Sequence, residues 1–407
     1  MIGKRFYPLC RIALGLGLVV ASCKPPPPVH STNGLTALRT FGDSLTTVRR
    51  PRLAEGVDTN DALSYYQAVM PLVKNGFELS TAEAALYWAS RLDPSWADPV
   101  YARSLLLLRA VRNDVLATFF QTHSERAARS VALTERQMQL MDSLRRAAWA
   151  RNPFVFTGLD FPTFVLRRRR APPEEAGLYA FENRQFATAD SLFAIALRKH
   201  PGEVGLRIYR AQALFYLARY DSAVTELEIG RDSLHAVVQQ HTAQILPSTD
   251  MFEYAIGITR VQQGDFVAAR AAYERALTEN LAFYWIHARL GGAALALGDT
   301  ATALSELQTA VEISGRDPVM HLFYGVVLHS ARRLPEAEEQ LRLAVELDSD
   351  YAEPYYRLGA VYQAEGKIPQ AIAQFHTFLA RAPKRDRDRA TVASALAALG
   401  EAPPDSR

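Results

Sequence analysis

Small side chains return every 34 residues through the second half of this 407-residue chain. The repeated positions are Ala269, Ala303, Ala337 and Ala371, and, 12 residues before each, Gly257, Gly291, Gly325 and Gly359. A constant period between about 20 and 50 residues is typical of stacked, repeated supersecondary units. Because small side chains let helices approach closely, this spacing predicts helix pairs that stack one upon the next.

Two further positions follow the same period. A bulky residue stands four places after each repeated alanine, as Tyr273, Leu307, Leu341 and Phe375. Glycine marks the turn between the two helices of a unit at Gly264, Gly298 and Gly366, where a left-handed conformation ends a helix, and Arg332 is the exception. The best copy, Ala352 to Pro383, carries Tyr355, Leu358, Gly359, Tyr362, Gly366, Ala371 and Phe375. This copy resembles the tetratricopeptide repeat family.

The resemblance implies an all-α, helix-turn-helix solenoid of about six to seven repeats with a C-terminal capping helix. We assign two units to residues 170–237, an insertion to 238–249, four units to 250–383, and the capping helix and tail to 384–407. Residues 61–169 form a degenerate helical region with an insertion. Its first part keeps the spacing at Ala82, Leu86 and Ala89, although Pro71 falls where a first helix is expected.

The N-terminus has the pattern of a secretory signal. Lys4, Arg5 and Arg11 precede the apolar run from Ile12 to Ala21, which is shorter than the ~20 residues that span a bilayer. The sequence from Val20 to Cys23 resembles the bacterial lipobox. That resemblance implies removal of residues 1–22 and acylation of Cys23, and residues 23–60 then form a proline-rich tether.

Composition and location follow from the same segment. Lys24 after the cysteine favours, by resemblance, the outer membrane, and the body of the protein would face the periplasm. Cys10 leaves with the signal and Cys23 is acylated, so no thiol remains for a disulfide or a metal site. A net charge of +3 gives no general attraction to nucleic acid. We expect no cofactor and no metal.

One short motif suggests catalysis. Residues 41–46 resemble the serine block of GDSL esterases, with Ser44 as nucleophile, and Asp232 and His235 have the spacing of the other two triad members. However, that family needs a parallel sheet, and three helical units separate Ser44 from Asp232. We therefore expect no enzyme and keep the esterase as a remote alternative.

Two other sets of residues have both a structural and a functional interpretation. His287 and His321 stand 34 residues apart and are interpreted as buried structural histidines rather than metal ligands. The run Arg167, Arg168, Arg169 and Arg170 is a solvated loop or, functionally, a contact for an anionic surface. The aromatic residues between Phe154 and Val165 are interpreted as packing beneath a domain junction.

The resemblance places partner-binding residues on a concave face lined by the first helix of each unit. The predicted set is mainly apolar and aromatic: Met251, Tyr254, Ile258, Val261, Trp285, Leu322, Val326, His329, Tyr356 and Gln363. Such a face suits a hydrophobic peptide or helix. We therefore predict a lipid-anchored interaction scaffold or adaptor that binds another envelope protein. The alternative is a glycan- or small-ligand-binding lipoprotein, which requires an exposed cluster among Trp88, Trp96, Trp149 and Trp285.

Overall fold

The computed structural model describes residues 48–75, 78–123, 135–155, 171–238 and 249–401. All regular secondary structure within these ranges is α-helical, which confirms the predicted all-α class. The helices form consecutive pairs: α3 (Ala62–Asn75) with α4 (Leu79–Leu92), α5 (Ala97–Thr122) with α7 (Glu135–Arg151), α8 (Pro173–Glu182) with α9 (Phe186–Lys199), α10 (Val204–Tyr216) with α11 (Tyr220–Val238), α12 (Thr249–Gln262) with α13 (Phe266–Glu279), α14 (Tyr284–Ala296) with α15 (Thr300–Ile313), α16 (Pro318–Ser330) with α17 (Leu334–Leu347), and α18 (Glu353–Ala364) with α19 (Ile368–Arg381).

Local sequence accounts for where these helices begin. The Asp265 and Asp299 carboxylates accept hydrogen bonds from the backbone N–H groups of Ala268 and Thr302, at 3.0 and 3.1 Å, and so cap α13 and α15. Proline stands in the first turn of α8, α16, α17, α18 and α19. Its missing N–H costs nothing there, because the first N–H groups of a helix have no partner within the helix.

The turns inside the units share one backbone conformation. Gly264, Gly298 and Gly366 have φ of 77°, 79° and 75°, as the glycine pattern predicts. The equivalent Arg332 has φ of 62°, so the exception in sequence is no exception in structure. Arg184 and Ala218 adopt the same left-handed conformation in the two preceding units, with φ of 58° and 56°. Therefore the stack imposes this turn even where a side chain makes it costly.

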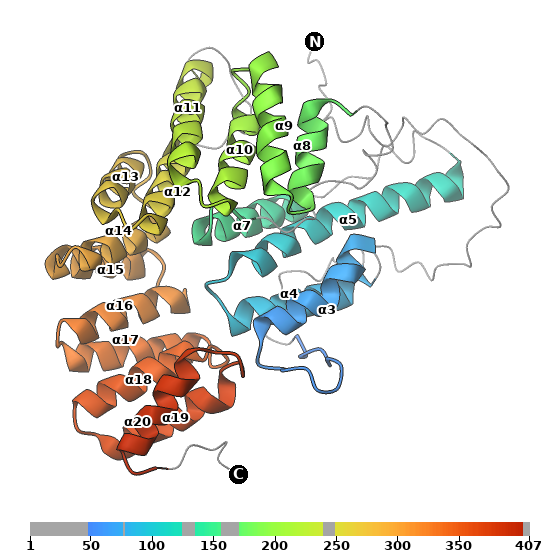
Figure 1. The fold of residues 1–407 in the computed structure, drawn as a ribbon. Helices are drawn as coiled ribbons and strands as arrows, with labels where there is room; N and C mark the ends of the chain where they lie inside the picture. The colour runs from blue at the N-terminus through green and yellow to red at the C-terminus, as the bar shows by residue number, and fades with distance from the viewer. Residues whose placement is uncertain (1–47, 76–77, 124–134, 156–170, 239–248, 402–407) are drawn as a thin grey trace.

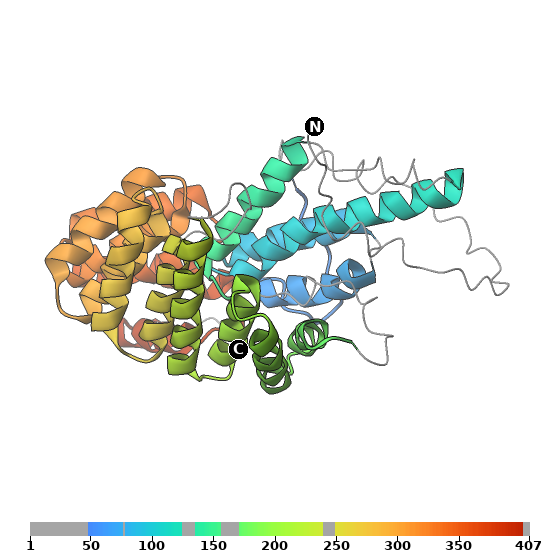
Figure 2. The same ribbon diagram turned by 90° about the horizontal axis from the view of Figure 1, so that it is seen from above.

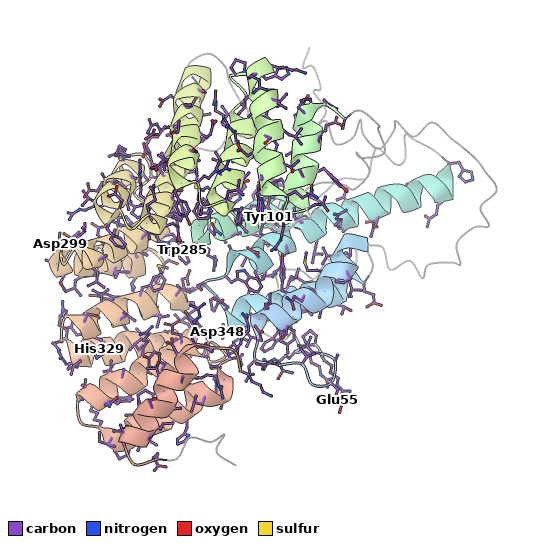
Figure 3. All side chains as sticks on the ribbon, in the orientation of Figure 1. Glu55, Tyr101, Trp285, Asp299, His329 and Asp348 are labelled. Atoms are coloured by element: carbon purple, nitrogen blue, oxygen red, sulfur yellow. The ribbon has the colours of Figure 1, made fainter. Side chains whose placement is uncertain are left out.

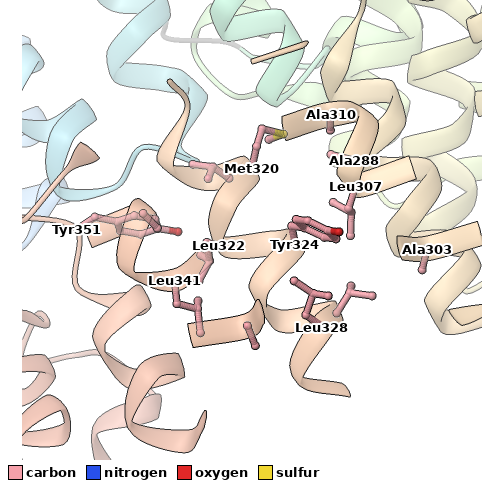
Figure 4. Close-up of a cluster of buried hydrophobic side chains, with 14 of the residues drawn as sticks. Ala288, Ala303, Leu307, Ala310, Met320, Leu322, Tyr324, Leu328, Leu341 and Tyr351 are labelled. Carbon is pink, nitrogen blue, oxygen red and sulfur yellow. The ribbon is translucent and has the colours of Figure 1, made fainter. Parts of the chain in front are cut away.

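The repeated small residues lie where paired helices touch. Ala269, Ala303, Ala337 and Ala371 are fully buried. A Cβ atom added to Gly257 would lie 2.3 Å from the Tyr273 ring, and one added to Gly359 would lie 2.4 Å from the Phe375 ring. The bulky residue of the second helix therefore fills the space that the glycine of the first helix leaves. Figure 4 shows the resulting core around Leu307, Leu322 and Leu341, which continues from unit to unit.

The front of the chain is more regular than its sequence indicates. Pro71 lies within α3 without ending it, and α3 pairs with α4. Ala82, Leu86 and Ala89 of α4 are fully buried, like the corresponding residues of later units. At the other end α20 (Asp388–Ala398) buries Val392 and Leu396 against the last pair, as a capping helix does. Gly400, with φ of 84°, follows it.

The units from α8 to α20 follow a curved path, and the end of α7 lies on the inside of the curve (Figures 1 and 2). We call the face of the first helices α10, α12, α14, α16 and α18 that points to this side the inner face. It carries the residues of the predicted concave surface. The first two helix pairs do not extend the curve freely, because they contact both its middle and its end.

Candidate functional site

The inner face is partly covered by the chain itself. Tyr254, Trp285 and Leu322 expose 0, 0 and 2% of their surface. Met251, Ile258 and Val261 are half-buried, as are Val326, His329 and Tyr356, whereas Gln363 is exposed. The expectation that all ten predicted residues line an open surface is therefore corrected: three are buried in this conformation. Whether any of them contacts a partner stays a prediction.

The covering segment comes from the end of α7. The Tyr254 hydroxyl donates a hydrogen bond to the carbonyl oxygen of Ala150. The Arg289 guanidinium donates to the carbonyl oxygen of Arg151 over 3.0 Å. These bonds join positions 104 and 138 residues apart in the chain, so no local pattern could have predicted them.

Trp285 is the centre of this contact (Figure 3). The guanidinium groups of Arg151 and Arg289 lie 5.6 and 5.4 Å from the centre of its ring. Arg151 comes from α7 and Arg289 from α14, one turn beyond Trp285. An indole face attracts cations, so it can hold both groups, but it does not neutralise either charge.

A second part of the inner face remains accessible on α16 and α18. Burial, together with the positive charges of Arg332 and Arg357, lowers the pKa of His329. The ring is therefore neutral near pH 7, which suits an apolar surface. Tyr356 packs 5.6 Å from Phe378, between ring centres, and the Arg357 guanidinium lies 4.7 Å from the centre of its ring. His329 is labelled in Figure 3.

The two histidines of the repeat are structural in geometry. Nδ1 of His287 lies 2.7 Å from Glu306 and Nε2 lies 3.0 Å from the carbonyl oxygen of Leu281. His321 repeats this arrangement with Gln340 and the carbonyl oxygen of Gly315. Each ring thus links a second helix to the turn before the unit. Within the described ranges no group of three or more His, Cys, Asp or Glu side chains is placed to hold a metal ion.

The remaining predicted residues are placed as follows. Cys23, Ser44 and the run Arg167 to Arg170 lie outside the described residues. Asp232 lies on α11 and pairs with the neighbouring Arg231, 2.9 Å away. Of the aromatic segment, Phe154 and Val155 are described and buried, at 1 and 4% exposure. No helix in the described part of the chain is long and apolar enough to cross a membrane.

The tryptophans are dispersed rather than gathered on one surface. Trp88, Trp96 and Trp149 pack against the hydrophobic cluster of the first two helix pairs. The Trp88 indole N–H donates to the carbonyl oxygen of Val48 over 3.0 Å, and the Trp96 ring centre lies 5.0 Å from that of Tyr66. Trp285 is buried in a different cluster. No exposed cluster of the kind that the glycan alternative requires is formed by these four side chains.

The array also touches itself at its two ends. Arg91 of α4 pairs with Asp348, at 2.6 Å, and with Asp350, at 3.1 Å, in the loop before α18. Arg385 donates two hydrogen bonds to Asp61, at 2.8 and 2.9 Å. The backbone N–H of Lys384 donates to Asp58, and the Asn60 amide donates to the carbonyl oxygen of Ala380. We call these contacts between the first and last units the clasp.

Models of the tetratricopeptide repeat match two stretches of the chain, residues 175–229 and 260–326. These stretches cover α8 to α11 and α13 to α16, which the structure shows as stacked helix pairs. This chain is a tetratricopeptide repeat protein. The resemblance that the sequence suggested is thereby confirmed. No curated protein sequence matches the chain.

Several solved tetratricopeptide repeat structures are similar to parts of the chain. YrrB, described as a repeat protein with an unusual peptide-binding site, is 20% identical over 47% of this chain and 93% of its own, with a TM-score of 0.37. A thermophilic repeat protein of Thermus thermophilus is 26% identical over 46 and 95%, with a TM-score of 0.37. The C-terminal part of a repeat protein of Cytophaga hutchinsonii is 14% identical over 55 and 82%, with a TM-score of 0.42.

Proposed function

We propose that this protein is a non-enzymatic interaction scaffold that is held at a bacterial membrane by lipid on Cys23 and binds another envelope protein on its inner face. Tetratricopeptide repeats are typically scaffolds rather than enzymes, because stacked helices present an extended surface for a partner. The observation that carries the proposal is the accessible stretch on α16 and α18. There Val326, His329 and Tyr356 are half-buried and Gln363 is exposed.

The chemistry of this stretch favours a partner with hydrophobic side chains. Val326 is aliphatic, Tyr356 offers an aromatic ring with a polar end, and the lowered pKa of His329 keeps that ring uncharged. Aromatic side chains that are partly covered on the free protein are the usual anchors of a protein interface. Gln363 adds a donor and an acceptor at the edge of the surface.

Membrane attachment is supported by the sequence from Val20 to Cys23 and by the four prolines that follow it. Two or more acyl chains hold a protein on a bilayer stably, whereas a single chain holds it only marginally. The prolines favour an extended spacer of about 3.1 Å per residue between the lipid and the repeats. The direction of the repeats toward the periplasm belongs to the same proposal.

The test is site-specific photo-crosslinking in living cells. A photoreactive residue replaces Gln363 on the inner face, and the matched control replaces Glu346, which is exposed on the second helix α17. We expect position 363, and not 346, to give an adduct with an envelope protein, and Cys23→Ala to move the scaffold out of the membrane fraction. Identical adducts from both positions, or adducts with cytosolic proteins alone, would contradict the proposal.

A further inference from the structure

The end of α7 lies on the inner face as a bound peptide would. Three side chains from three successive first helices donate to main-chain oxygens of one short segment: Tyr216 of α10 to Phe154, over 2.6 Å, Tyr254 of α12 to Ala150, and Arg289 of α14 to Arg151. We call Ala150–Phe154 the cis segment. Donors that bind main-chain oxygens hold a segment in place whatever its side chains are.

Two side chains of the cis segment are held specifically. The Phe154 ring stacks on Phe215, with ring centres 4.1 Å apart and planes 16° apart. Phe154 is 1% exposed, within a cluster formed by Val204, Ala211, Val224, Leu227, Leu234, Phe252, Ala255, Ile256 and Ala272. The Arg151 guanidinium lies over Trp285. One aromatic anchor and one side chain on an indole are what peptide recognition uses for specificity.

The inner face is better suited to a different occupant at the Arg151 position. Arg289 forms no ion pair with a carboxylate in the described part of the chain, and the cis segment brings a second cation to the same indole. The Arg289 Nε, the Trp285 Nε1 and the Tyr273 hydroxyl are buried without a hydrogen-bond partner there. Buried donors that lack an acceptor cost about 1–3 kcal/mol each. The face therefore has unused donors and an unneutralised positive charge.

We propose that Ala150–Phe154 is an intramolecular ligand of the inner face and that the partner is a peptide segment with a carboxylate side chain three residues before an aromatic one. The aromatic ring takes the place of Phe154 on Phe215. The carboxylate takes the place of the Arg151 side chain and pairs with Arg289. The cis segment is displaced when this partner binds, so the free protein is self-occupied. This inference rests on the proposed scaffold function and specifies its partner.

Two substitutions in the cis segment weaken its hold without changing the receiving face. Arg151→Ala removes the cation over Trp285 and the hydrogen bond of Arg151 to the carbonyl oxygen of Pro94. Asn152→Ala removes the acceptor for the backbone N–H of Phe154, a 2.9 Å bond that shapes the turn. Met138→Ala is the matched control, since Met138 lies on the same helix and is 45% exposed.

The experiment measures binding of fluorescent peptides by anisotropy to the full chain. The probe spans residues 147–155 with the change Arg151→Glu, and the unchanged peptide and a probe that also carries Phe154→Ala are its controls. We expect the probe to bind about tenfold more tightly than the unchanged peptide, because it pairs a carboxylate with Arg289. Affinity should rise further in Arg151→Ala or Asn152→Ala and stay unchanged in Met138→Ala, since apparent affinity follows the fraction of protein with a free site.

Arg289→Gln in the protein should abolish the preference for the probe. Equal affinity for the probe and the unchanged peptide, or no binding to any folded variant, would overturn the inference. Circular dichroism identifies the folded variants, and Asn152→Ala keeps the test valid if Arg151→Ala does not fold. Failure here leaves the crosslinking result at Gln363 unaffected, because that residue lies on α18, beyond the contacts of the cis segment.

Discussion

At the scale of single residues, the fold depends on where a Cβ atom is absent. A methyl group on Gly359 would lie 2.4 and 2.5 Å from two atoms of the Phe375 ring, well inside contact distance. On Gly292, in the first helix of another unit, it would meet nothing within 4 Å. Gly359 therefore serves close packing, whereas Gly292 gives α14 only unneeded freedom.

We predict opposite effects for the same change at these two glycines. Gly359→Ala should lower the free energy of unfolding by about 1–3 kcal/mol, because the Phe375 ring must move within a packed core. Gly292→Ala should raise it by about 0.5–1 kcal/mol, because alanine loses less backbone entropy in a helix. Urea unfolding followed by circular dichroism measures both. Similar effects of the two changes would refute the packing role of Gly359.

At the scale of helices, His287 connects α14, α15 and the turn between units. Both of its ring nitrogens face acceptors, so both must carry protons. The hydrogen bond to Glu306, together with the bond to the Leu281 carbonyl, raises the pKa of His287. In the unfolded chain that pKa returns to about 6.5. The stabilisation is therefore complete below about pH 6.5 and is lost as pH rises through the folded pKa.

We predict that Glu306→Gln removes this pH dependence. The wild type should exceed the variant in free energy of unfolding by about 1 kcal/mol at pH 5.5, and the difference should shrink by pH 8.5. Urea titrations at several pH values measure it. The next unit offers a matched gain of function: Gln340→Glu, beside His321, should introduce the same dependence there. A constant difference across the pH range would show that the pair acts only through its shape.

Helix pairing could be predicted from sequence because it depends on close neighbours. The 34-residue spacing of Ala269 and Gly257 fixes which faces of paired helices touch. The left-handed turn at Arg332 could not be predicted, since neighbouring units impose it on a residue that resists it. Pro71 concealed the first helix pair for a related reason: its position in sequence is unfavourable, but tertiary packing maintains α3.

The candidate site was predictable only in part. The inner-face positions follow from the repeat register, but the burial of Tyr254 and Trp285 depends on Ala150 and Arg151, which lie in a region without that register. Phe154, buried as a packing residue, was the available signal, because an aromatic side chain directly after Asn152 and Pro153 must find a surface to cover it.

At the scale of the whole molecule, the clasp decides whether the array is a closed or an open curve. Asp61 and Asp348 are 7% exposed, and the guanidinium groups of Arg385 and Arg91 neutralise them from across the contact. Neighbouring units stack without these bonds, so the clasp constrains shape rather than local folding. Figure 3 shows Asp348 between the first and last units.

We predict that the double variant Arg91→Ala with Arg385→Ala opens the curve. Asp61 and Asp348 would lose their cations, and leaving them buried without partners should cost about 1–3 kcal/mol, which separation of the two ends relieves by returning both carboxylates to water. The radius of gyration in small-angle X-ray scattering should increase. The control is Arg333→Ala, which breaks only the exposed pair with Glu336 in α17 and should change stability by less than about 1 kcal/mol and shape not at all. If the double variant keeps the radius of the wild type while its circular dichroism is unchanged, apolar contacts rather than charges close the array.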